Sequence, residues 1–358
     1  MAGEGITDPS RVGLIEGGSD NDALFLKKFS GEILQTFEES NVFKPLHTIR
    51  TIESGKSAQF PVTGIATANY HTPGENIAEE GGSSSTYLSD IAKTEKIINI
   101  DKMLVASSFL ANIDDVKNHY DIRSVYSNES GKALAVRFDT AVSKTFIAAA
   151  RDSANLTQVG NTGGRYDVAN GVFGTGSISL GSIASVTGSQ LVSAFFSAAQ
   201  QLDENDVPSD GRFCVLRPQE YYKLVTGADS SNAFTLTASA ANKDVGGEGS
   251  LASGMVPQIA GITIYKSNHI PSTNLSGTST GDGEANNDVF GSDGVGYNGD
   301  FRNTLGIVSH SAAVGTVKLL DLATESEYQI ERQGTLFVAK YAMGHGVLRP
   351  ECAIELIA

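Results

Sequence analysis

The chain has 358 residues, of which 40% are hydrophobic, and it carries a formal net charge of −15. This length suits one large domain or two ordinary domains, and the apolar content is that of a globular chain rather than a disordered one. The acidic balance argues against a protein that reads nucleic acid, because such binding depends on clustered Lys and Arg.

Neither a membrane span nor a secretory signal is expected. Apolar runs stay well short of the roughly 20 residues that cross a bilayer. The N-terminus lacks the basic-then-apolar pattern of a signal peptide. The two cysteines, Cys214 and Cys352, make no disulfide framework and suit a reducing compartment. We therefore expect synthesis in the cytoplasm and no membrane partner.

The N-terminal part of the chain is predicted to be an arm with one helix. Residues 1–19 are rich in Gly, Ser and acids and show no periodicity, which is typical of a flexible arm. Over residues 21–39, apolar side chains recur at spacings of three and four, which predicts an amphipathic helix. These side chains are Phe25, Leu26, Phe29, Ile33, Leu34 and Phe37.

The next segment is predicted to form an extended β-hairpin. Residues 57–65 are the outgoing strand and 93–103 the returning strand, around a Gly/Ser-rich tip that cannot make a core. A hairpin of this length is not stable alone in water. It must lie on its own domain or be completed by a neighbouring subunit, and the residues alone lean slightly toward the first.

A long helix is expected over about 114–153, with a candidate break near Gly131. Its apolar positions hold no strict heptad, which disfavours a coiled coil. Strand pieces among turns follow at 155–189, and then helices and strands alternate, which predicts a compact α/β domain with a mixed sheet. The alternation comprises a helix at 189–202, a strand at 212–216, a helix at 218–225 and a strand at 259–265. Residues 271–300 are loop, and the rest is strand-rich and returns to the long helix.

No catalytic constellation is visible in the sequence. The six histidines show no metal-ligand spacing, and Cys214 fits a small buried hydrophobe better than a nucleophile. The Gly-rich run 171–181 lacks the pattern of a dinucleotide or phosphate loop. The acidic loop 281–294 lacks the regular oxygen spacing of a calcium site, although adventitious cation binding stays open. We therefore expect no catalytic residue, no cofactor and no metal.

The most specific pattern lies near the C-terminus and is repeated, piece by piece, upstream. Residues 339–346 read AKYAMGHG and 348–351 read LRPE. Earlier pieces, in collinear order, are 54–61 (SGKSAQFP), 73–76 (PGEN), 94–96 (TEK), 118–121 (NHYD), 313–319 (AVGTVKL) and 321–323 (DLA). In this combination the chain resembles the major capsid proteins of short-tailed, T-seven-like tailed bacteriophages.

The resemblance implies an α+β, HK-ninety-seven-like capsid fold. Its parts would be an N-terminal arm, an extended β-hairpin loop, a peripheral domain with a long helix, an inserted axial α/β domain and strands that return to the peripheral domain. In that order they correspond to residues 1–50, 51–103, 104–185, 186–304 and 305–358.

The same resemblance implies a self-assembling subunit. Pentamers and hexamers would form an icosahedral shell around double-stranded DNA, with a scaffolding protein and a portal as partners, in the host cytoplasm and then in the virion. The DNA would be enclosed without sequence-specific binding. From the residues alone, the net charge of −15 fits a wall that does not trap DNA, and it fits equally an acidic surface that keeps an abundant protein soluble, which is the simpler interpretation. Two alternatives are an encapsulin-type nanocompartment, which encloses protein cargo, and an unrelated enzyme with an α/β domain.

In this family the extended loop lies over an adjacent subunit, so we expect inter-subunit contacts there. The residues are Lys56, Gln59, Phe60, Glu75, Asn76, Lys93, Glu95 and Lys96. We expect no covalent cross-link from the loop lysines. Ser311 and Leu320 stand where relatives often carry Arg, and 81–85 read GGSSS where relatives carry basic residues. The tip should therefore hold a neighbour less strongly.

Overall fold

The structure is a computed structural model, and it describes eleven ranges of the chain. These are residues 41–64, 66, 68–71, 73–74, 91–100, 103–113, 122–153, 162–174, 186–226, 258–274 and 299–358. The predicted arm and helix of residues 1–40, the hairpin tip, the NHYD segment and the acidic loop 281–294 lie outside these residues.

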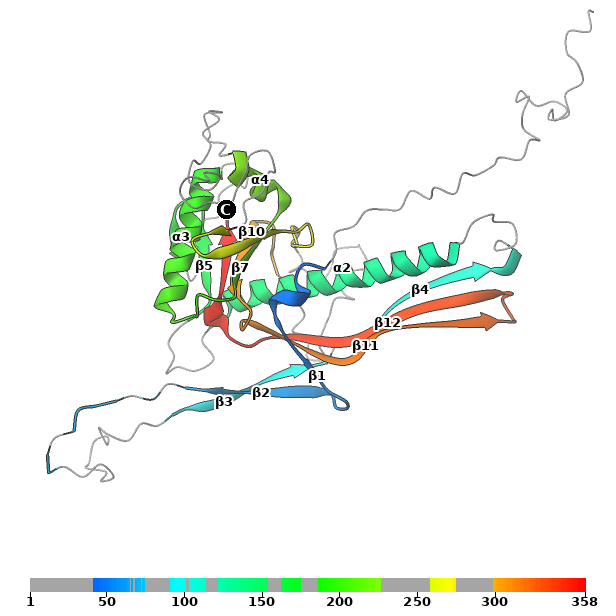
Figure 1. The fold of residues 1–358 in the computed structure, drawn as a ribbon, viewed down its shortest axis with the longest axis horizontal. Helices are drawn as coiled ribbons and strands as arrows, with labels where there is room; N and C mark the ends of the chain where they lie inside the picture. The colour runs from blue at the N-terminus through cyan, green and yellow to red at the C-terminus, as the bar shows by residue number, and fades with distance from the viewer. Residues whose placement is uncertain are drawn as a thin grey trace, which may run out of the picture.

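A four-stranded sheet in the order β1-β11-β12-β4 forms one half of the molecule. Strand β1 pairs in parallel with β11, and the other pairs are antiparallel. The bounds are β1 Thr48–Thr51, β4 Leu104–Ala111, β11 Val314–Gln329 and β12 Gly334–Val347. A short 3₁₀ turn, η1 Lys44–Leu46, leads into β1. The long β11–β12 pair runs alongside helix α2 (Figure 1).

Helix α2, Ile122–Arg151, is the spine that joins the two halves. Leu134, Phe138, Val142 and Phe146 recur every four residues and are buried on one face, as the helical periodicity predicts. The candidate break at Gly131 is wrong, because α2 is continuous through that residue. A single glycine lowers helix stability by only about 1 kcal/mol, and the packed face that follows it outweighs this cost.

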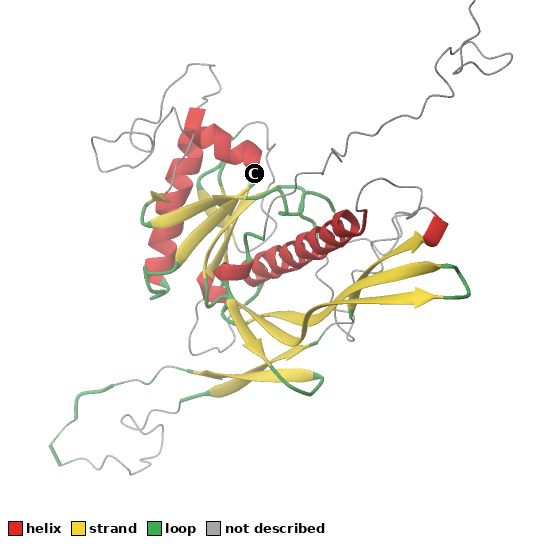
Figure 2. Ribbon diagram, turned by 45° about the vertical axis from the view of Figure 1, so that its right-hand side comes forward, coloured by secondary structure: helices red, strands yellow, loops and turns green. Residues whose placement is uncertain are grey.

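The other half is a mixed seven-stranded sheet in the order β6-β5-β13-β10-β7-β9-β8. Its strands are β5 Gly164–Asp167, β6 Val172–Gly174, β7 Arg212–Leu216, β8 Gln258–Ile259, β9 Ile262–Lys266, β10 Thr304–His310 and β13 Ala353–Ile357. Helices α3 Gly188–Glu204 and α4 Pro218–Thr226 pack on this half (Figure 2). The 3₁₀ turn η4 Pro350–Cys352 connects the two sheets before β13.

The single strand predicted at 259–265 is wrong, because two strands joined by a tight turn occupy this place. Ala260 and Gly261 have φ values of 51° and 76°, so both central residues of the turn are left-handed. Two such residues match the right-handed twist of a hairpin. The apolar residues on both sides of the turn conceal it in the sequence.

The described residues share one large core that runs from α2 into the seven-stranded sheet. Phe146, Leu191, Leu216 and Ile354 are fully buried in it. Cys214 is also fully buried and unbonded, which confirms the prediction of a small core residue. In the described part of the chain, none of the helices has both the length and the apolar character needed to cross a bilayer.

Candidate functional site

The predicted extended loop is a two-stranded ribbon that projects from the body. Strand β2, Ser57–Thr63, pairs antiparallel with β3, Lys93–Asn99, in unbroken register from Ser57 opposite Asn99 to Thr63 opposite Lys93. The ribbon leaves the four-stranded sheet at its base and extends away from both sheets (Figures 1 and 2). Both predicted strands are thus present, and each ends earlier at the tip or base than the sequence indicated.

Among the described residues, the base of the ribbon is packed on its own subunit. Ala58 and Ile98 face each other across the ribbon and form a small apolar cluster with the fully buried Val317 of β11. Phe60 lies at the edge of this cluster, with the Arg50 guanidinium 5.5 Å from its ring centroid. The cluster fixes the angle at which the ribbon departs.

Glycines in the two long strands let the ribbon base approach closely. A Cβ atom on Gly344 would overlap the carbonyl oxygen of Asn99, and one on Gly346 would lie 2.7 Å from Cγ1 of Ile98. On β11, a Cβ on Gly315 would lie 2.7 Å from Cδ1 of Leu348. The sequence analysis uses the GHG run, residues 344–346, only as part of a family resemblance and does not predict these contacts. Glycines in the interior of a strand are the sequence signal that could have indicated a close approach of two backbones.

The structure places most of the predicted contact residues on this ribbon, and the strand alternation divides them between its faces. Gln59, Lys93 and Glu95 are exposed on the outer face, beside Ile97, which is 50% exposed. Lys56 is exposed just before β2.

Phe60 and Lys96 lie on the opposite, inner face. Lys96 forms an ion pair with Asp152 over 3.8 Å, and both side chains are substantially exposed, so this pair contributes less than about 1 kcal/mol. Glu75 and Asn76 lie outside the described residues.

A buried polar cluster lies under the root of the N-terminal segment. His47 Nδ1 donates to the Phe43 carbonyl oxygen over 2.7 Å. Thr316 Oγ1 lies 2.7 Å from His47 Nε2 and 2.8 Å from His345 Nδ1. Burial lowers the pKa of His345 to about 3, with a smaller contribution from the nearby His47, and burial also lowers the pKa of His47.

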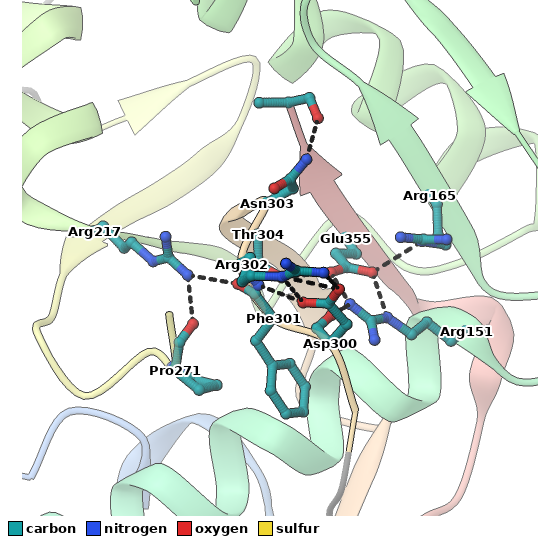
Figure 3. Close-up of polar contacts among 11 residues, drawn as sticks. Arg151, Arg165, Arg217, Pro271, Asp300, Phe301, Arg302, Asn303, Thr304 and Glu355 are labelled. Carbon is teal, nitrogen blue, oxygen red and sulfur yellow. Dashed lines mark hydrogen bonds and ion pairs between the residues drawn. The ribbon is translucent and has the colours of Figure 1, made fainter. Parts of the chain in front are cut away.

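An ion network ties α2 to the seven-stranded sheet (Figure 3). Glu355 of β13 is fully buried and accepts from Arg151 Nη2 over 2.6 Å and from Arg165 Nε over 3.1 Å. Thr304 Oγ1 donates to the same carboxylate over 2.6 Å. Arg217 Nη2 reaches the carbonyl oxygen of Phe301 over 2.9 Å. The charge of the carboxylate is thereby compensated, and the C-terminal end of α2 is tied to β13 of the seven-stranded sheet.

The described residues contain no group of three or more His, Cys, Asp or Glu side chains that could hold a metal ion. Their perturbed ionisable groups are explained by packing: burial raises the pKa of the Cys352 thiol to about 12, and the hydrogen bond from Lys318 lowers the pKa of Asp321. The described residues present a projecting ribbon and a body of two sheets to other molecules.

Comparisons with known proteins identify the class. Residues 59–357 match the family described as Gp10A-like major capsid protein. The chain is 33% identical over 345 residues to the major capsid protein of Escherichia phage T7, covering 93% of this chain and 91% of the relative. It is 32% identical over 353 residues to that of Enterobacteria phage T3, covering 95% and 92%.

Solved structures show the same architecture. The capsid structure of cyanophage P-SCSP1u superposes with a TM-score of 0.76 at 39% identity, covering 99% of each chain. The mature capsid of bacteriophage PhiM1 gives a TM-score of 0.71 at 18% identity, covering 98% of this chain and 96% of that one, and shows the shared fold alone.

An α+β subunit with a projecting ribbon, a spine helix and two sheets, similar to these phage capsids, is a capsid subunit with the HK-ninety-seven-like fold. The chain belongs to the Gp10A-like major capsid protein family. Both predictions, the fold and the function as a phage major capsid protein, are confirmed. Family membership also favours a phage shell over a nanocompartment that encloses protein cargo.

Proposed function

We propose that this chain assembles as pentamers and hexamers into the icosahedral head shell of a phage, with the β2–β3 ribbon lying on an adjacent subunit. The observation that carries this proposal is the exposed outer face of the ribbon. Its base is packed against Val317, whereas its outer face exposes Ile97 and the chain beyond β2 exposes Tyr70 completely.

The physical chemistry of a two-stranded ribbon supports a neighbouring copy as its partner. Such a ribbon is marginal alone in water, and both of its edges present backbone groups that remain available for pairing. A second subunit would bury the outer face and supply polar partners for Gln59, Lys93 and Glu95. The inner-face residue Phe60 is already partly packed, so its contribution would be to orient the ribbon.

The two halves of the subunit suit different tasks in a shell. In this proposal the four-stranded sheet with α2 is the peripheral domain, and the seven-stranded sheet with α3 and α4 is the axial domain near the centre of a pentamer or hexamer. One subunit must make near-equivalent contacts in several environments. A body whose spine helix is tied to the sheet through Glu355, together with a slender ribbon, would meet this requirement if the ribbon adjusts while the body keeps its shape.

Double-stranded DNA would be enclosed without sequence-specific binding, during assembly in the host cytoplasm with a scaffolding protein and a portal. The net charge of −15 supports enclosure rather than binding, since an acidic wall repels the phosphate backbone. The partners follow from the family and are part of the same proposal.

A substitution pair on the outer face tests the proposal. Ile97→Asp places a charge on the proposed contact, and Ile97→Val keeps it apolar at the same site. We expect the wild-type chain and the Val variant to form shells or tubes in electron microscopy, and the Asp variant to remain as small species with an unchanged urea midpoint. Normal assembly of the Asp variant, or a wild-type chain that stays monomeric at high concentration, would contradict the proposal. Nucleic acid inside native particles separates a phage head from a nanocompartment.

A further inference from the structure

A pocket of about 230 Å³ lies beside the ion network at Glu355, where the C-terminal end of α2 meets β5 and β13. It is called here the arginine pocket, and its charged and hydroxyl lining consists of Arg151, Arg165, Asp300, Thr304 and Glu355. Four of these five side chains are labelled around the network in Figure 3 with the partners that they bind, and the fifth, Thr304, lies beside them. One water molecule takes up about 30 Å³ of the liquid, so a pocket of this size holds several waters and has room for a small oxyanion.

The buried carboxylate of the pocket already has all its partners. Glu355 Oε1 accepts from Arg151 Nη2 and from Thr304 Oγ1, both over 2.6 Å. Its Oε2 accepts from Arg151 Nε over 2.7 Å and from Arg165 Nε over 3.1 Å. Four donors on one carboxylate leave it little capacity to pair with a further cation, and two guanidinium groups share its single negative charge.

The second carboxylate, at the rim, is paired with a guanidinium of its own. Asp300 accepts from Arg302 Nε over 3.0 Å and from Arg302 Nη2 over 2.6 Å. Glu355 and Asp300 thus face three guanidinium groups, those of Arg151, Arg165 and Arg302. The surroundings of the pocket therefore hold one positive charge in excess, in a chain whose formal net charge is −15.

Arg165 supplies both the excess charge and the unused hydrogen-bond donors. Its Nε donates to Glu355, and within the part of the chain that the structure describes its two Nη groups make no hydrogen bond. The side chain is 24% exposed, so these donors are recessed but open to a small solute. The Nη edge of a guanidinium matches two oxygens of a tetrahedral oxyanion.

Arg151 is held in place and has a different role. Besides Glu355, it binds the Asp300 carbonyl oxygen through Nη2 over 2.8 Å, and its guanidinium carbon lies 5.3 Å from the centroid of the Phe301 ring. These contacts leave it fixed beside the pocket. It would attract an anion by its charge, while Arg165 would bind the anion directly.

We propose that the arginine pocket binds a single phosphate group, which accepts hydrogen bonds from the Nη groups of Arg165. The bound group would compensate the excess positive charge and add a link between β5 and the end of α2. Since the donors are recessed and the chain is acidic as a whole, a free phosphate ion fits the pocket better than a phosphate in the DNA backbone does. The pocket lies within one subunit, so this proposal does not depend on the proposed shell contacts.

Isothermal titration calorimetry of the full-length chain with sodium phosphate tests the pocket, with sodium chloride at the same ionic strength as the reference. Two charge-assisted hydrogen bonds predict a dissociation constant of about 1 mM for the wild type. Arg165→Gln removes the charge and the fork, so it should bind phosphate at least about tenfold more weakly. Arg332→Gln, at an exposed arginine between β11 and β12, is the matched control and should bind as the wild type does.

A second variant keeps the test sharp if Arg165→Gln does not fold. Arg165→Lys keeps the positive charge beside Glu355 but lacks the planar pair of donors, so it should also bind phosphate more weakly than the wild type. Absence of saturable phosphate binding by the wild type would overturn the proposal, and so would an unchanged affinity in whichever of these variants is folded. A short DNA duplex added as a competitor identifies the source: displacement of phosphate points to the DNA backbone, and undisturbed binding to the free ion.

Discussion

Gly344 of β12 lies directly against Asn99 of β3, so close that a Cβ atom on the glycine would overlap the asparagine carbonyl oxygen. Replacement by alanine must therefore displace the backbone at the ribbon base. We expect Gly344→Ala to lower the free energy of unfolding by about 2–3 kcal/mol, measured by urea denaturation.

Gly131 of α2 is the matched control, because a Cβ atom there would meet no heavy atom within 4 Å. Gly131→Ala should raise the free energy of unfolding by about 0.5–1 kcal/mol through better helix propensity. Equal effects of the two alanines would show that the ribbon base is not held at this contact.

The ion network at Glu355 makes a prediction about the junction of the two halves. Glu355→Gln leaves Arg151 and Arg165 without their shared carboxylate, which should destabilise the subunit by about 3 kcal/mol. Glu325→Gln removes an exposed partner of Lys340 and should cost less than about 1 kcal/mol. Thermal unfolding of both variants distinguishes a buried network from a surface ion pair; similar losses would contradict this distinction.

The N-terminus of α3 depends on a reciprocal cap. Thr187 accepts from the Gln190 backbone N–H, and the Gln190 side chain accepts from the Thr187 backbone N–H over 2.9 Å. Thr187→Ala should therefore lower stability by about 1 kcal/mol. Ser193→Ala, on the exposed side of the same helix, should be neutral or slightly stabilising. A neutral Thr187→Ala would show that this cap adds nothing.

The two thiols should be protected from alkylation in the folded subunit. Burial raises the pKa of Cys352 to about 12 and that of Cys214 well above its ordinary value, so few thiolates exist at pH 8. We expect iodoacetamide to label both only after denaturation, as followed by mass spectrometry. Rapid labelling of the native chain would contradict the burial of these residues.

Local patterns predicted much of the fold. Helices α3 and α4 and strand β7 appear where periodicity and the initial Pro218 placed them. The ribbon strands were predicted as β-like segments on either side of a Gly/Ser-rich tip. The same patterns failed at Ala260 and Gly261, where a two-residue turn lies within an apolar run.

Local sequence patterns could not predict which strands pair when they lie far apart in the chain. Strand β10 pairs with β7 and β13, so the chain after residue 303 first enters the seven-stranded sheet, then forms β11 and β12 beside α2, and returns to the same sheet in β13. The hydrogen bond between His47 and Thr316 and the contact of Gly344 with Asn99 also join residues more than 200 positions apart. Periodicity reports which face of an element is buried and carries no information about its partner.

The parallel pairing of Thr48 with Gly315 affects how the chain can fold while it is being synthesised. Translation proceeds at about 5–20 residues per second, so β1 waits at least about ten seconds for the strand that receives it. Until then the four-stranded sheet of the growing polypeptide is incomplete and cannot contact other copies of the chain. Association between growing chains on one polysome is thereby disfavoured until β11, β12 and β13 have been synthesised.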